Sequence, residues 1–372
     1  MHVAQSLGSG LMNKLGEVLA RVRAEVREQH PYKVGVPSGD ISVKLNQNES
    51  PFDLPVALKD AVFAGWNEIA FNRYPSEQPY DLAELIASNI GWDPEGIIIG
   101  NGSNELTYAL GLTFITAGST VVLPRPMFSF YERVVHIYGG EVIPVAPLES
   151  LGFDTEGILA AIERTCPSMV VVTSPNNPTG LVVPLTELRT IAESTAGLVL
   201  IDEAYIEFAD EPSMLTLLSH YPNVILLRTF SKAFGLAGSR LGYLIGHPPL
   251  MGEIMKIRPP FMIDRFTSCV TKLLLEHSQL IQDRVELIRS STQGLIDALQ
   301  EIEGMRVLGG QANFVTFRPP CDGQRLFTAL AERGVLVRNM SGYPELRGFL
   351  RVSAGAPAEN RRFLKALIQA ML

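Results

Sequence analysis

Five short apolar runs separated by helical patterns constrain the fold of this chain more than any other feature. They read EGIIIG (95–100), STVVLP (119–124), MVVVTSP (169–175), LVLIDEA (198–204) and NVILLRTF (223–230). Strands that are apolar throughout are buried on both faces, and intervening helices favour parallel pairing. The sequence therefore predicts an α/β fold with a mostly parallel sheet flanked by helices.

A change of pattern after residue 265 predicts a second, smaller unit. A long helical stretch (269–302) precedes the short strands ANFVTF, VLVRN and FLRVS, and a final helix begins at Pro357. We predict an N-terminal arm helix with an extended segment (1–45), a large α/β domain (46–265) and a small α+β domain (266–372). The arm is amphipathic, which predicts packing on the protein's own body or on a second subunit. Its apolar positions are Leu11, Leu15, Val18, Leu19, Val22 and Val26.

Charge and cysteine usage exclude several classes of protein. The net charge of −8 argues against a nucleic-acid partner, which would need a basic face. No apolar run approaches the ~20 residues of a membrane span, and no signal-peptide pattern opens the chain. Three scattered cysteines without CxxC predict a reduced, cytoplasmic protein, and six scattered histidines predict no metal site.

Polar motifs follow the predicted strands where each strand ends. These are GNGSNE (100–105), SPNNPTG (174–180), DEAY (202–205) and TFSK (229–232). Ligands of open α/β sheets bind outside the carboxyl ends of the strands. We therefore expect these motifs to meet at one site.

The GNGSNE loop predicts a phosphate cradle rather than a dinucleotide fingerprint. Glu105 stands where that fingerprint needs its third glycine, which argues against a nicotinamide-dependent dehydrogenase. The amides of Ser103 and Asn104, at the start of a helix, can bind a phosphate. A plain strand-to-helix turn is an equal alternative on this motif alone.

Lys232 stands among small and apolar residues, where its pKa should fall and its amine become a nucleophile. Such an amine forms a Schiff base with an aldehyde, and pyridoxal phosphate (PLP) is the common aldehyde cofactor. PLP needs this lysine, a carboxylate for its pyridinium nitrogen, and a phosphate cradle. Lys232, Asp202 and the 100–105 loop can supply all three, although Asp202 and Lys232 alone could also form a structural ion pair. Further candidate partners are Ser231 and Arg240 for the phosphate, and Asn177 and Tyr205 for the phenolic oxygen.

The motifs SPNNPTG, DEAYIEF and SKAFGLAGSRLGY resemble those of fold-type I PLP-dependent aminotransferases. The segments KLNQNESPF (44–52), NRYP (72–75) and GVLVRNMSGYPELRGFLRVSAG (334–355), with the PY at 31–32, resemble histidinol-phosphate aminotransferases more narrowly. The resemblance runs from about residue 30 to the end. It implies transamination between histidinol phosphate and 2-oxoglutarate, giving imidazole acetol phosphate and glutamate, in histidine biosynthesis.

The resemblance also implies roles for single residues. Lys232 would hold the cofactor and shuttle the proton, while Asp202 would pair with the pyridinium nitrogen. Phe128 would stack on the ring, and Tyr74 would reach the phosphate of the neighbouring subunit, which implies a homodimer with shared active sites. The remaining cofactor contacts would be Ser103, Asn104, Asn177, Tyr205, Ser231 and Arg240.

Two arginines and a tyrosine are the candidate substrate residues. Arg351 would bind the α-carboxylate of glutamate or 2-oxoglutarate, and Arg338 the phosphate of histidinol phosphate. Tyr32 would close over the substrate. Both arginines interrupt short apolar strands, where an unpaired charge is costly. Met262 departs from the family, which commonly has asparagine there, so it bears on substrate selectivity.

Three other functions are alternatives on the sequence alone. An aromatic amino-acid aminotransferase and, behind it, a threonine-phosphate decarboxylase share the scaffold. A PLP-sensing transcription regulator would need an N-terminal DNA-binding module, and fewer than fifty residues precede KLNQNES.

Overall fold

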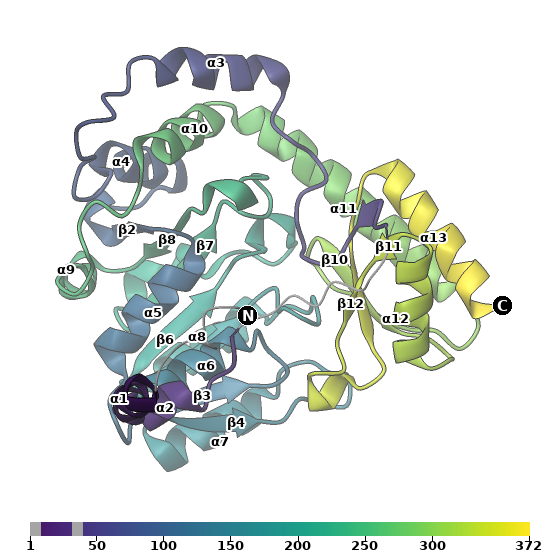
Figure 1. Cartoon of the computed structure of the whole chain (residues 1–372), viewed down its shortest axis with the longest axis horizontal. Helices are drawn as coiled ribbons and strands as arrows, with labels where there is room; N and C mark the ends of the chain where they lie inside the picture. The colour runs from purple at the N-terminus through teal and green to yellow at the C-terminus, as the bar shows by residue number, and fades with distance from the viewer. Residues whose placement is uncertain (1–8, 32–39) are drawn as a thin grey trace.

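The computed structural model describes residues 9–31 and 40–372, without the side chains of residues 9–13. A seven-stranded sheet lies at its centre, in the order β2-β8-β7-β6-β5-β3-β4 (Figure 1). β8 is antiparallel to both of its neighbours, and the other pairs are parallel. The predicted α/β fold with a mostly parallel sheet is therefore confirmed. The strands are β2 (Ile97–Gly100), β3 (Thr120–Pro124), β4 (Glu141–Val145), β5 (Met169–Thr173), β6 (Leu198–Asp202), β7 (Val224–Thr229) and β8 (Gly242–Ile245).

Helices cover both faces of this sheet because successive side chains of each buried strand point to opposite sides. In β6, Leu198 and Leu200 belong to one apolar cluster, while Val199 and Ile201 belong to another. The first cluster is closed by α5 (Ser103–Phe114), α6 (Phe130–Ile137) and α9 (Pro248–Met255). The second is closed by α3 (Val56–Trp66), α4 (Tyr80–Ile90), α7 (Thr155–Thr165), α8 (Leu185–Glu193) and α10 (Arg265–Leu275).

Aspartates start several helices, as expected for residues whose carboxylate caps free backbone amides. Asp154 accepts a hydrogen bond from the Gly157 nitrogen at 3.0 Å in α7, and Asp264 accepts one from Thr267 at 2.8 Å in α10. The helical stretch predicted over 269–302 is two helices. α10 ends at Leu275, and α11 (Ser278–Gln300) follows.

A four-stranded antiparallel sheet, in the order β12-β13-β10-β9, forms the C-terminal part (Figure 1). Its strands are β9 (Arg306–Leu308), β10 (Phe314–Arg318), β12 (Arg338–Asn339) and β13 (Leu350–Ser353). It packs with α11, α12 (Gly323–Glu332) and α13 (Pro357–Met371) around a separate apolar cluster. β1 (Val43–Lys44) pairs in parallel with β11 (Val335–Leu336), so the segment before residue 46 is joined to this C-terminal part. The predicted domain boundaries at residues 45 and 265 stay predictions.

The N-terminal arm forms α1 (Ser9–Ala20) and α2 (Ala24–Arg27) instead of one helix. Its apolar side chains Leu15, Val18, Leu19 and Val26 are 43–58% exposed in this chain. Arg23 fixes the arm by donating to the backbone oxygen of Ile137 at 2.7 Å. Packing of the apolar face on a second subunit stays a prediction. Across the described ranges, no helix has the length and apolar character required to cross a membrane.

Candidate active site

A cavity of about 560 Å³ opens at the carboxyl ends of the parallel strands, against the C-terminal sheet. Nearly all of the predicted site residues line it, although their individual roles stay predictions. They are Ser103, Asn104, Phe128, Asn177, Asp202, Tyr205, Ser231, Lys232, Arg240, Arg338 and Arg351. Two predicted residues are not there. Tyr74 is 79% exposed and does not line the cavity of its own chain, and Tyr32 lies outside the described residues.

Lys232 lies in the cavity just beyond the end of β7. Its Nζ donates to the backbone oxygen of Gln47 at 3.1 Å, and it lies 5.9 Å from the ring centre of Tyr205. Burial, followed by the positive charge of Arg351, lowers the pKa of Lys232 to about 8. The amine is thus largely neutral in mildly basic solution, as a nucleophile or a proton carrier needs to be.

Asp202 ends β6 and presents its carboxylate to the same cavity. Its Oδ1 accepts from the Ala204 nitrogen at 3.0 Å, and its Oδ2 accepts from the hydroxyl of Tyr131 at 2.6 Å. Burial raises the pKa of Asp202 to about 6, while the Tyr131 bond acts in the opposite direction. Asp202 is thus hydrogen-bonded to Tyr131 and Ala204, whereas Lys232 donates to Gln47. Asp202 and Lys232 therefore do not form the structural ion pair that the sequence left open as an alternative.

The Tyr205 hydroxyl is held from two sides. Asn48 Nδ2 donates to it at 3.0 Å and Asn177 Nδ2 at 3.5 Å. The Oδ1 of Asn177 accepts from Arg351. Burial raises the pKa of Tyr205 to about 12, so the phenol keeps its proton and can donate it to an acceptor in the cavity.

The 100–105 loop is shaped to bring backbone amides next to Arg240. Gly102 has a φ of 78°, and a Cβ there would lie 2.7 Å from Nη2 of Arg240. A Cβ on Gly242 would lie 2.7 Å from the Ser103 nitrogen. Arg240 donates to the Ser231 hydroxyl at 3.3 Å. These close approaches, with a helix start and a guanidinium, form a cradle whose donors fit a phosphate group.

Glu105, the residue that breaks the dinucleotide fingerprint, has a structural partner. It forms an ion pair with Arg258 at 3.1 Å, and its Oε2 also accepts from the backbone nitrogen of Asn101 at 3.2 Å. The side chain of Arg258 is only 4% exposed. The glutamate therefore stabilises the loop through these two contacts. A dinucleotide fingerprint would have a glycine at this position, which allows the helix to pack closely.

Arg351 and Arg338 reach the cavity from neighbouring strands of the C-terminal sheet. Arg351, in β13, is buried, and donates to the backbone oxygen of Asn46 at 3.3 Å as well as to Asn177. Arg338, in β12, is half-buried and forms no ion pair with any residue that the structure describes. Met262, in contrast, packs against the core and does not line the cavity.

Sequence reasoning missed four residues of the site. Asn46 and Gln47 contribute backbone oxygens, and Asn48 and Tyr131 contribute side chains. The quoted segment KLNQNESPF contained three of them, but backbone contacts carry no sequence signal of their own. Tyr131 was missed because it lies on the buried face of an amphipathic helix, where an aromatic residue is normally part of the core.

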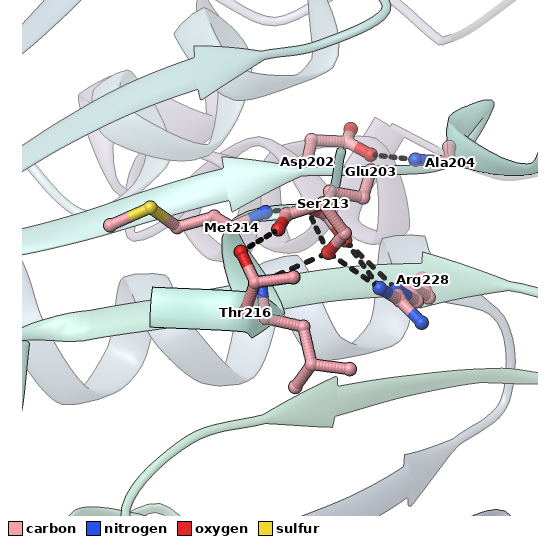
Figure 2. A network of polar contacts seen from close by, with 8 residues as sticks. Asp202, Glu203, Ala204, Ser213, Met214, Thr216 and Arg228 are labelled. Carbon is pink, nitrogen blue, oxygen red and sulfur yellow. Dashed lines mark hydrogen bonds and ion pairs between the residues drawn. The ribbon is translucent and has the colours of Figure 1, made fainter. Parts of the chain in front are cut away.

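A buried ion pair supports the strand end behind Asp202. Figure 2 shows the Glu203 carboxylate among Ser213, Met214 and Arg228, while Asp202 bonds to Ala204. Arg228 approaches Glu203 at 2.8 Å, Ser213 donates to it at 2.8 Å, and the Met214 nitrogen donates at 3.0 Å. The side chains of Glu203 and Arg228 are 2% and 10% exposed. Their partners satisfy charges that would otherwise be costly to bury.

The chain matches the family described as aminotransferase class I and II over residues 40–367. It belongs to this family, and the predicted fold-type I transferase fold is confirmed. The resemblance to histidinol-phosphate aminotransferases is also confirmed. One relative, the histidinol-phosphate aminotransferase of Chlorobium phaeovibrioides, is 40% identical over 327 residues, which cover 88% of this chain and 91% of the relative.

Two solved structures share the fold of this chain, and one of them contains pyridoxal-5'-phosphate. The histidinol-phosphate aminotransferase of Sinorhizobium meliloti, in complex with pyridoxal-5'-phosphate, superposes with a TM-score of 0.84 at 25% identity, covering 95% of this chain and 98% of the other. The L-threonine-O-3-phosphate decarboxylase of Porphyromonas gingivalis gives a TM-score of 0.77 at 22% identity, covering 88% and 99%. The latter likeness shows the fold alone.

Proposed function

We propose that this chain is a PLP-dependent aminotransferase that acts on histidinol phosphate and 2-oxoglutarate and yields imidazole acetol phosphate and glutamate. The observation that carries the substrate assignment is the pair Arg338 and Arg351 in one cavity with Lys232. Histidinol phosphate has a phosphate and no α-carboxylate, and 2-oxoglutarate has carboxylates and no phosphate. Two guanidinium groups at one site can bind these two substrates in turn.

The donor set of the cavity fits PLP. Ser103, Asn104, Ser231 and Arg240 would hold the phosphate, and Asp202 would pair with the ring nitrogen. When bound, the cofactor supplies an electron sink that acidifies the bond between the substrate's Cα and its hydrogen.

The chain's own groups would orient and move the proton. Lys232, with its lowered pKa, would carry a proton at the substrate's Cα. Tyr205 and Asn177 would hold the phenolic oxygen of the ring, and Phe128 would cover the ring face. Arg351 donates to Asn177, so substrate binding at Arg351 would be linked to the residue that holds the phenolic oxygen.

We further propose that the protein is a cytoplasmic homodimer with shared active sites. Tyr74 stacks on Phe261 at 4.9 Å between ring centres and is exposed, which suits a residue that serves the neighbouring subunit. Nearby in the sequence, Phe63, Phe71 and Tyr80 are also more than half exposed. Large exposed aromatic side chains of this kind are typical of subunit interfaces. Tyr32 is proposed to close over the substrate.

The test is a single-turnover titration of the purified holoprotein. Histidinol phosphate, phenylalanine and histidine are added separately, and the absorbance band of the lysine-bound cofactor is followed. The proposal predicts loss of the band at a far lower concentration of histidinol phosphate than of phenylalanine. Preference for phenylalanine would move the substrate to aromatic amino acids. Release of CO₂ without a keto product would indicate a decarboxylase.

A further inference from the structure

We propose that Tyr131 is a positioning residue that holds the Asp202 carboxylate in place for the ring nitrogen of PLP and at the same time braces the ring of Phe128. The inference goes beyond the proposed function, and it rests on the assignment of Asp202 as the partner of that nitrogen. Tyr131 itself does not line the cavity. It therefore acts through its two neighbours rather than on the substrate.

The contact between Tyr131 and Asp202 joins two elements that are far apart in sequence. Tyr131 lies in the first turn of α6, and Asp202 ends β6. The phenolic oxygen donates to Oδ2 of Asp202 at 2.6 Å, a distance typical of a strong hydrogen bond to a charged acceptor. Tyr131 is only 2% exposed, and its ring belongs to the core against α5 and β3. The hydroxyl consequently has little freedom to move away from the carboxylate.

The need for this bond follows from the surroundings of Asp202. Burial and the neighbouring Glu203 both raise the pKa of this carboxyl, while Tyr131, the Ala204 amide and Lys232 lower it. A carboxylate must be ionised to pair with a pyridinium nitrogen. Tyr131 provides the one side-chain hydrogen bond to Asp202 among the described residues, and it favours the ionised form.

The second contact of Tyr131 is with Phe128. The two rings pack edge to face, with their centres 6.3 Å apart and their planes at 86°. Phe128 lines the cavity, three positions earlier on the loop that leads into α6. One buried side chain thus touches both the carboxylate below the site and the aromatic ring proposed to stack on the cofactor.

The test compares Tyr131→Phe with Asp202→Asn and with the double variant, using PLP binding to the apoprotein as the readout. Tyr131→Phe keeps the ring and removes only the hydroxyl. We expect PLP to bind about tenfold more weakly, since a bond to a charged acceptor is lost. As the pH is lowered, the affinity for PLP should also begin to fall at a higher pH in this variant than in the wild type, because the pKa of Asp202 is no longer lowered by the Tyr131 hydroxyl. In the Asp202→Asn background, the same change should have no further effect.

Tyr243→Phe is the matched control. Tyr243 is 4% exposed and packs on the opposite face of the sheet, so this variant also loses a buried hydroxyl, but PLP affinity should not change. Equal losses from Tyr131→Phe in both backgrounds would show that the tyrosine does not act through Asp202 and would overturn the inference. An Asp202→Asn protein that binds PLP like the wild type would also overturn it, but the transaminase activity would then still stand.

A second measurement covers the case in which Tyr131→Phe fails to fold. Replacing Tyr131 with 3-fluorotyrosine keeps the hydroxyl and makes it a stronger donor. The acid limb of PLP binding should then move to lower pH, in the direction opposite to that of the phenylalanine variant. An unchanged acid limb would count against the proposed bond.

Discussion

Arg338 and Arg351 stand directly opposite each other on the antiparallel strands β12 and β13. Directly opposed side chains lie on one face of a sheet, and like charges in such a pair destabilise it. Both side chains reach the same cavity. An anion that binds there relieves the repulsion, so the pairing favours negatively charged substrates over neutral ones.

Replacing Arg338 by glutamine should separate the two substrates. We expect KM for histidinol phosphate to rise about 10- to 100-fold, because a charged hydrogen-bond donor to phosphate is lost. The glutamate half-reaction should change far less, since Arg351 remains. The measurement is KM and kcat for each half-reaction. Arg318→Gln, on strand β10 of the same sheet and outside the cavity, is the control. Equal effects on both substrates would contradict the assignment of Arg338.

Lys232→Met should stabilise the apoprotein in a pH-dependent manner. The folded-state pKa of Lys232, about 8, is below its ordinary value of 10.5. Burying the charged amine therefore destabilises the fold fully below pH 8, and this penalty declines between the two pKa values. The variant should have the higher Tm at pH 7, and the difference should vanish above about pH 10.5.

The control for this experiment is the exposed lysine Lys256, which pairs with Glu253 on the surface. Lys256→Met should give no such pH-dependent difference, because exposed ion pairs contribute little to stability. The Lys232→Met holoprotein should also lack transaminase activity. A variant that transaminates at a normal rate would exclude Lys232 as the proton carrier.

Subunit mixing tests whether Tyr74 serves the partner's active site. Tyr74→Ala and Lys232→Ala should each be nearly inactive. A mixed dimer contains one intact site, with Lys232 from one chain and Tyr74 from the other. Random exchange of equal amounts should restore roughly a quarter of the wild-type activity, because half of the dimers are mixed and each has one working site. Failure to regain activity, with exchange verified by mass spectrometry, would place Tyr74 outside the shared site.

Arg228→Met should destabilise the protein by about 3–5 kcal/mol, because it leaves the Glu203 charge buried without its partner. Urea unfolding of the apoprotein measures this loss. Arg289→Met, which breaks the more exposed pair with Asp210, should change the free energy of unfolding by no more than about 1 kcal/mol. Similar losses in free energy of unfolding in the two variants would mean that the buried pair contributes no more to stability than the exposed one.

The sequence predicted five strands of the large sheet because each is a continuous apolar run. It did not predict β4 and β8. β4 is an edge strand with exposed Glu141 and Pro144, so it lacks that pattern. β8 follows the glycine-rich segment that holds Lys232 and Arg240, where local pattern indicates a loop.

Most of the predicted cofactor residues line one cavity, and the sequence could predict this meeting because their motifs are short and lie at strand ends. Contacts between distant segments could not be found in this way. Asn48 and Tyr205 are separated by 157 residues, and their hydrogen bond depends on how the C-terminal sheet meets the large sheet. Nothing in the local sequence around either residue indicates that the two side chains meet.

The three consecutive residues Asn46, Gln47 and Asn48 contact Arg351, Lys232 and Tyr205 in turn. The first two contacts use backbone oxygens, which every amino acid carries. Alanine substitutions at positions 46 and 47 would therefore keep these two contacts, and alanine scanning would not show that their peptide groups anchor a guanidinium and an amine. Conversely, any insertion or deletion before residue 46 that alters the register of β1 would displace all three anchors at once. The length of this segment is thus under tighter constraint than its composition.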